Sequence, residues 1–137
     1  MNVKKLEWED KYSVGVLEID NQHKRMFTVI NELLDAINEN KQEEHLISII
    51  DTLLQYKKFH FETEEKYFKE FNYDGAEEHI QKHKEFAKKL NELRDKHPSF
   101  NIEFAFELVD FLENWLTGHL MTIDQKYVKC FAEHGLK

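Results

Sequence analysis

Between residues 60 and 83 the sequence reads HFETEEKYFKEFNYDGAEEHIQKH, with two pairs of potential metal ligands on either side of a turn signal. His60 and Glu64 are four residues apart, as are His79 and His83. On an α-helix this spacing places two side chains one turn apart on the same face. The Asn-Tyr-Asp-Gly stretch between the pairs is typical of a turn. The segment therefore predicts two neighbouring helices that each present ligands.

The rest of the chain has the same helical character. With one proline and four glycines in 137 residues, the composition favours helices. Apolar residues recur at spacings of three and four in four segments, and the connections between them are short. The pattern predicts an all-α fold, an antiparallel up-down-up-down four-helix bundle, in one domain over residues 1–137. We expect an N-terminal arm over 1–19, bundle helices at about 20–38, 43–71, 75–96 and 101–119, and a short C-terminal helix at about 122–132.

Several residues mark the expected helix ends. Asp20 is a candidate N-cap for the first helix, and a polar break over Asn38 to Lys41 follows that helix. Asp74 with Glu77 has the spacing of a capping box before the third helix. That helix should stop before Pro98, and the fourth should begin near Asn101. Gly118 and the capping pattern from Thr122 to Gln125 indicate a bend or break.

The predicted topology places six potential ligands at one end of the bundle. The first and third helices begin at this end, and the second and fourth helices end there. A lone buried histidine is usually a hydrogen-bonded core residue, but a buried, unpaired Glu64 carboxylate would cost several kcal/mol. Convergence at one level therefore indicates a metal site. The residues are His23, His60, Glu64, His79, His83 and His119.

Asp124 is a seventh candidate ligand. It follows His119 by five residues, which on an unbroken helix would turn its side chain by about 140° from the histidine. The irregularity expected between Gly118 and Thr122 would bring Asp124 inward.

The ligand set indicates the metal. Five imidazoles and two carboxylates are too many for one tetrahedral zinc ion. They suit two octahedral-type ions, and iron accepts this mixture of nitrogen and oxygen donors. Two ferrous ions, two carboxylates and a bridging hydroxide sum to a charge of about +1, which a buried site tolerates. We expect the other core residues near the site to be apolar, so that the pocket admits a small neutral gas.

The motifs together resemble those of the bacterial hemerythrins over almost the whole chain. The resemblance implies that His79, His83 and His119 bind one iron, that His23 and His60 bind the other, and that Glu64 and Asp124 bridge both beside an oxo or hydroxo group. It also implies a dioxygen pocket lined by Met26, Phe61, Trp115, Leu116 and Tyr127. The matching motifs are Trp8 with Val14-Gly15, residues 19–24, His60 to Glu65, His79 to His83, and Trp115 to His119 followed by Asp124 and Tyr127.

Two positions depart from the family pattern. Family members often carry methionine where this chain has Phe68, and a Tyr-Pro turn where it has Tyr73-Asp74. We expect neither position to touch a ligand.

The resemblance implies reversible dioxygen binding for storage, delivery or scavenging, without enzymatic turnover. One alternative is a di-iron redox protein of the oxidase or peroxidase kind, but no histidine here has a glutamate three residues before it. A second alternative is oxygen sensing. A zinc peptidase is excluded because the chain has no His-Glu-x-x-His motif.

Charge and cysteine content set the expected surroundings. The net charge of −8 argues against a nucleic-acid partner, and no apolar run approaches membrane-spanning length. The N-terminus is too polar for a signal peptide, and Cys130 is the only cysteine. We therefore expect a cytoplasmic monomer that binds dioxygen and could deliver it to an oxygen-consuming enzyme.

Overall fold

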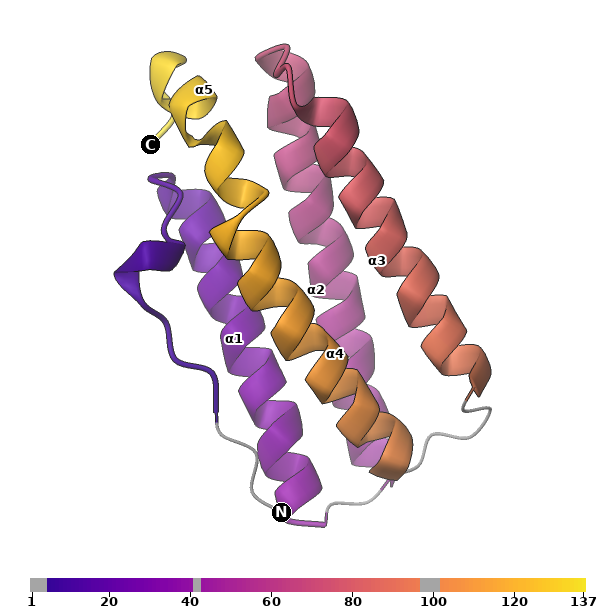
Figure 1. The fold of residues 1–137 in the computed structure, drawn as a ribbon. Coiled ribbons are helices and arrows are strands. Elements are labelled where there is room, and N and C mark those ends of the chain that lie inside the picture. The colour runs from indigo at the N-terminus through magenta and orange to yellow at the C-terminus, as the bar shows by residue number, and fades with distance from the viewer. Residues whose placement is uncertain (1–4, 41–42, 97–101) are drawn as a thin grey trace.

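Four long helices form the body of the protein in a computed structural model that describes residues 5–40, 43–96 and 102–137 (Figure 1). α1 packs against α2 and α4, and α3 packs against the same two helices. No residue within these ranges lies in a strand. The predicted all-α, up-down-up-down bundle is confirmed. Its helices are α1 (Leu17–Asn38), α2 (Glu43–Glu70), α3 (Ala76–Lys96) and α4 (Ile102–Met121).

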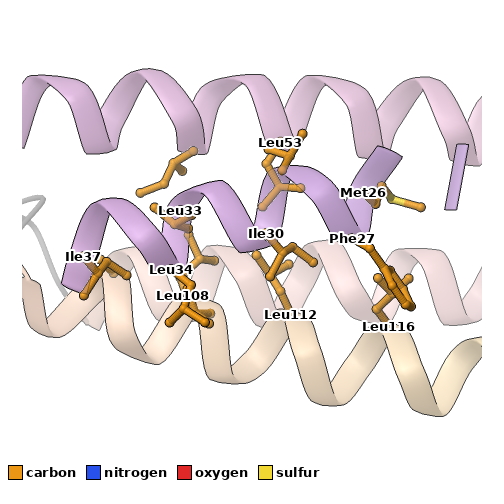
Figure 2. Packing of buried hydrophobic residues seen from close by; sticks show 14 of the residues in the cluster. Met26, Phe27, Ile30, Leu33, Leu34, Ile37, Leu53, Leu108, Leu112 and Leu116 are labelled. Carbon is orange, nitrogen blue, oxygen red and sulfur yellow. The ribbon is translucent and has the colours of Figure 1, made fainter. Parts of the chain in front are cut away.

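A stripe of buried apolar side chains on α1 forms the centre of the core. Figure 2 shows this stripe facing Leu53 of α2 and the leucines of α4. Burying one such side chain contributes roughly 1.5–3 kcal/mol relative to leaving it exposed, so the stripe fixes the rotation of α1. Its labelled members are Met26, Phe27, Ile30, Leu33, Leu34 and Ile37, opposite Leu108, Leu112 and Leu116.

The start of α1 differs from the prediction. Asp20 is not the N-cap, because the helix begins at Leu17 and Val16 occupies the cap position. The Asp20 carboxylate instead accepts hydrogen bonds from the Ser13 hydroxyl at 2.5 Å and the Val14 N–H at 2.9 Å. It also lies in the first turn, where the helix dipole favours a negative charge. Asp20 therefore fastens the N-terminal arm, with its short helix η1 (Asp10–Tyr12), to α1.

Replacing Asp20 with alanine should lower the free energy of unfolding by roughly 1–3 kcal/mol, because two hydrogen bonds to a charged acceptor are lost. Chemical denaturation of the variant and the wild type measures the difference. Asp51→Ala, at an exposed helical position on α2, is the matched control and should change stability by less than about 0.5 kcal/mol. Equal destabilisation by the two substitutions would contradict the fastening role of Asp20.

The end of α4 also differs from the prediction. The helix continues past Gly118 without a break, and the Thr122 hydroxyl donates a hydrogen bond to the Gly118 carbonyl at 2.8 Å instead of capping a new helix. The chain turns only after Met121. Two short elements follow, the 3₁₀ helix η2 (Asp124–Tyr127) and the helix α5 (Val128–Glu133).

Of the remaining residues predicted to mark helix ends, those before the third helix lie within the described ranges. α3 begins at Ala76, so Gly75 rather than Asp74 flanks its first turn. The predictions that involve Lys41, Pro98 and Asn101 lie outside the described residues.

One end of the bundle collects the elements that matter for function. The start of α1, the end of α2, the start of α3 and the end of α4 lie together there, with η2 and α5 nearby (Figure 1). In the described parts of the chain, no helix combines the length and apolar character needed to cross a membrane.

Candidate metal centre

All seven predicted ligand residues lie inside this end of the bundle. Each side chain is buried, with at most 7% of its surface exposed. They come from five elements that are distant in sequence, so only the folded bundle brings them together. The residues are His23 on α1, His60 and Glu64 on α2, His79 and His83 on α3, His119 on α4 and Asp124 on η2.

One group of donors consists of Glu64 and three histidines, His79, His83 and His119. Their ligand atoms all lie within 4.8 Å of one another. The His83 Nε2 is 3.4 Å from the Glu64 Oε1, and the Nε2 atoms of His119 and His79 are 3.1 Å apart. This is the spacing expected of atoms that surround one cation.

A second group consists of two histidines, His23 and His60, with Glu64 and Asp124. The Nε2 atoms of the histidines are 2.9 Å apart. The His60 Nε2 is 3.2 Å from the Glu64 Oε1, and the His23 Nε2 is 3.3 Å from the Asp124 Oδ2. The second group therefore has one histidine fewer than the first.

The two carboxylates join the groups. Glu64 belongs to both. The Asp124 Oδ1 is 2.9 Å from the His119 Nε2 and 3.1 Å from the His79 Nε2, whereas its Oδ2 faces His23. The five-residue spacing from His119 is accommodated because the chain leaves α4 and re-enters a 3₁₀ turn at Asp124. Each carboxylate can thus contact two cations at once.

Several polar atoms of the site lack hydrogen-bond partners within the protein. The Glu64 Oε1, both Asp124 oxygens and the His83 Nε2 are buried without a hydrogen bond. Leaving one such atom unsatisfied costs about 1–3 kcal/mol, and more when it is charged. Two cations placed among the converging oxygens and nitrogens would satisfy these atoms, so the donor set fits a pair of metal ions.

The protonation states also suit metal binding. Burial lowers the pKa of His60 to about 4 and lowers that of His119, so both imidazoles are neutral at pH 7. Burial alone would raise the pKa of Glu64, but its close contacts with His60 and His83 lower the pKa overall. The pKa of Asp124 is likewise lowered, against burial, by His119. Neutral imidazole and ionised carboxylate are the forms that bind metals.

Three further residues orient the ligands, and the sequence analysis did not assign them this role. The His60 Nδ1 donates to the Gln22 Oε1 at 2.6 Å, and the His83 Nδ1 donates to the Glu65 Oε2 at 2.8 Å. The Tyr127 hydroxyl donates to the Glu64 Oε2 at 2.7 Å, and burial raises the pKa of this phenol well above its usual range. Such contacts fix the imidazole tautomer and leave each Nε2 free for a metal.

The spacing of buried residues along α1 could have identified Gln22 as a buried residue. Gln22 lies between Ile19 and Met26 at spacings of three and four, on the buried face of α1. A buried amide beside a ligand histidine needs a partner, and Gln22 has two, because its Nε2 also donates to the Thr63 hydroxyl at 3.2 Å.

The five residues predicted to line the gas pocket occupy three environments. Phe61 stacks on His83 with ring centroids 3.7 Å apart, and Trp115 stacks on His119 at 4.2 Å. Met26 and Leu116 are buried in the main core, at the end of the stripe nearest the site (Figure 2). Tyr127 contacts Glu64 through its hydroxyl.

Two expectations about the surroundings are wrong. Phe68 was expected to avoid the ligands, but its ring packs against His79 at a centroid distance of 4.7 Å. The core near the site was expected to be apolar, but Lys57 is buried there with 2% of its surface exposed. The helical spacing of α2 indicates that Lys57 is buried, because Lys57 lies three residues before His60 and four after Leu53.

A four-helix bundle that encloses two histidine–carboxylate groups joined by shared carboxylates defines a class of proteins that bind a pair of metal ions. Residues 14–131 match the model of the hemerythrin HHE cation binding domain. The chain belongs to the hemerythrin family.

Curated relatives agree with this assignment. A bacteriohemerythrin from Clostridium acetobutylicum is 26% identical over 125 residues, which is 88% of this chain and 97% of the relative. A bacteriohemerythrin from Pseudomonas aeruginosa is 32% identical over 123 residues, 90% of this chain and 79% of the relative. A hemerythrin-like protein from Naegleria gruberi is 27% identical over 120 residues, 88% of each chain.

The cofactor that this family implies is a pair of iron ions bridged by an oxo or hydroxo group. The two donor groups, with their shared carboxylates and unsatisfied buried atoms, fit it.

Proposed function

We propose that the chain binds dioxygen reversibly at a non-haem di-iron centre and serves oxygen storage, delivery or scavenging. The observation that carries this proposal is the asymmetry of the two donor groups, which share Glu64 but contain three histidines and two. An ion with three imidazoles and the bridging ligands is coordinatively saturated. An ion with only two imidazoles and the same bridging ligands keeps one coordination position open for a small ligand.

Each ligand has a place in this proposal. His79, His83 and His119 would hold one iron, and His23 and His60 would hold the other, which keeps a free position. Glu64 and Asp124 would bind both irons.

When bound, the irons supply the redox electrons and the open coordination site. The surrounding chain holds the imidazoles in one tautomer through Gln22 and Glu65, and it keeps the Glu64 carboxylate in place through Tyr127. Phe61 and Trp115 cover two of the histidines with stacked rings and restrict the access of water. We propose that Met26, Phe61, Trp115, Leu116 and Tyr127 line the dioxygen pocket.

The second candidate function is an oxygen sensor or a di-iron oxidase or peroxidase. Di-iron oxidases use a carboxylate-rich shell built from Glu-x-x-His pairs. The two donor groups here contain five histidines and two carboxylates. We propose that the protein is not an enzyme, because fewer anionic ligands stabilise high-valent iron less well.

The test is an oxygenation cycle. The chain is loaded with ferrous iron under argon, exposed to air and returned to argon, and its absorption spectrum is followed. We expect a visible band that appears in air and is lost when oxygen is removed. One zinc ion per chain without an oxygen-dependent spectrum would refute the proposal. Rapid oxidation with release of hydrogen peroxide would favour the oxidase.

Replacing Gln22 with leucine should weaken iron binding by about 10–100-fold, because His60 loses the acceptor that orients its ring. Competition with a chelator measures the affinity. Gln55→Leu, at an exposed position on the same helix as His60, is the control and should bind iron like the wild type. An unchanged affinity in the Gln22 variant would show that this hydrogen bond does not support the ligand.

The cellular location, the oligomeric state and the partners of the protein stay predictions. We propose a cytoplasmic monomer that could pass dioxygen to an oxygen-consuming enzyme. The net charge of −8 supports the absence of a nucleic-acid partner.

A further inference from the structure

The Gln125 side chain joins two parts of the chain next to a proposed metal ligand. It follows Asp124 directly in η2, and it is half-buried. Its Nε2 lies 3.1 Å from the carbonyl oxygen of Leu120 and 3.3 Å from that of Ser13, and the Lys11 carbonyl oxygen is 3.5 Å away. All three neighbours are acceptors, so the amide presents its two N–H groups to them. Gln125 therefore donates both to the end of α4 and to the N-terminal arm.

The contact with Leu120 caps α4. The last four carbonyls of an α-helix have no partner within the helix, and α4 ends at Met121, one residue after Leu120. The chain has to leave the helical path here, because on a continued helix Asp124 would be turned by about 140° from His119. The Gln125 amide thus holds the turn that brings Asp124 to the metal centre.

The contact with Ser13 fastens the same turn to the arm. The Ser13 hydroxyl is bound to α1, and its carbonyl accepts from Gln125. The next arm residue, Val14, is 1% exposed and belongs to a buried apolar cluster with Tyr127. The Tyr127 hydroxyl donates to Glu64. The arm therefore supports η2 at two points, and each point lies next to a residue that holds or supplies a shared carboxylate.

We propose that Gln125 is a positioning residue for Asp124 and that it couples docking of the N-terminal arm to metal binding. This inference rests on the proposed role of Asp124 as a ligand to both irons. Metal ions that hold Asp124 fix η2, and a fixed η2 keeps the Gln125 amide against the arm. A docked arm in turn restricts η2 to the conformation in which Asp124 points inward. Because binding free energies are linked, each event strengthens the other by the same factor.

Hydrogen exchange measures this coupling on the full chain under argon, with and without ferrous iron. Residues 36–40, at the other end of α1, report any general stabilisation by the metal. In the wild type we expect iron to slow amide exchange in residues 5–16 by about tenfold more than in residues 36–40.

Two variants with the same change in charge isolate the role of the amide. Gln125→Glu keeps the size of the side chain but replaces the N–H donors with carboxylate oxygens. It should abolish the additional slowing in the arm and weaken iron binding by about tenfold, as measured by competition with a chelator. Lys126→Gln, at the exposed next position of η2, removes an exposed ion pair with Glu78 and should behave like the wild type.

Each outcome decides the question. Equal slowing of the arm and of residues 36–40 in the wild type would overturn the inference, and this result does not depend on how any variant folds. An arm that responds to iron in the Gln125 variant as it does in the wild type would overturn it as well. Iron content measured on the same samples separates the two proposals. A wild-type chain that retains no iron refutes the di-iron function and the coupling with it, whereas an iron-loaded wild type whose arm does not respond refutes only the coupling.

Discussion

A Glu64→Ala variant is expected to lose both metal ions, not one. The Glu64 Oε1 is 3.2 Å from the His60 Nε2 and 3.4 Å from the His83 Nε2, so this oxygen lies between the two donor groups. Removing the carboxylate takes a ligand from each ion and raises the net charge of the buried centre from about +1 to about +2. The cost of an uncompensated buried charge is about 3–5 kcal/mol, equivalent to a loss of roughly two to four orders of magnitude in affinity.

Metal analysis after anaerobic iron loading and gel filtration measures this loss. Glu62→Ala is the matched control, because Glu62 is exposed on the same helix two residues away. Circular dichroism should show that both variants remain helical. A Glu64 variant that keeps one tightly bound iron would mean that Glu64 serves a single ion, and the shared-carboxylate arrangement would then be wrong.

Removing both metal ions is expected to lower the melting temperature by about 25 °C. Each ion present at about a thousand times its dissociation constant stabilises the fold by roughly 4 kcal/mol. For a chain of this length, 1 kcal/mol corresponds to a shift of about 3 °C. The physical source is the set of buried atoms left without partners, which includes both Asp124 oxygens and the Glu64 Oε1.

Thermal unfolding of the loaded and the chelated chain under argon measures this shift. The Glu64→Ala variant is the internal control, because its melting temperature should not respond to iron. Identical melting temperatures for the loaded and the chelated wild type would show that the ions do not bind at the buried site.

The bundle could be predicted because its determinants are periodic. Apolar residues at spacings of three and four define each helix, and ligands at the same spacing share a helical face. The up-down topology then brings the ends of four helices together, so the convergence of His23, His60, His79 and His119 follows from helix order alone.

Features set by tertiary contacts could not be predicted in the same way. The start of α1 depends on the arm that Asp20 binds through Ser13 and Val14, and local capping preference pointed to Asp20 itself. Gly118 is compatible with a helix end, yet packing of α4 carries the helix past it. Lys57 interrupts the apolar pattern because aromatic rings enclose its ammonium, and these rings come from other positions in the chain.

The position of Asp124 could be predicted only in part. Its spacing from His119 shows that a regular helix cannot bring both side chains to one site. The inward position requires the turn after Met121 and the 3₁₀ geometry of η2, which the sequence indicated only as an irregularity.

Oxygen titration of the ferrous, iron-loaded chain is the most direct test of the central proposal. Reversible binding at a shared di-iron centre predicts that oxygen uptake saturates at one dioxygen for each pair of irons and that the same amount is recovered when the solution is purged with argon. Continued oxygen consumption with release of hydrogen peroxide, or no uptake by a chain that contains both irons, would contradict it.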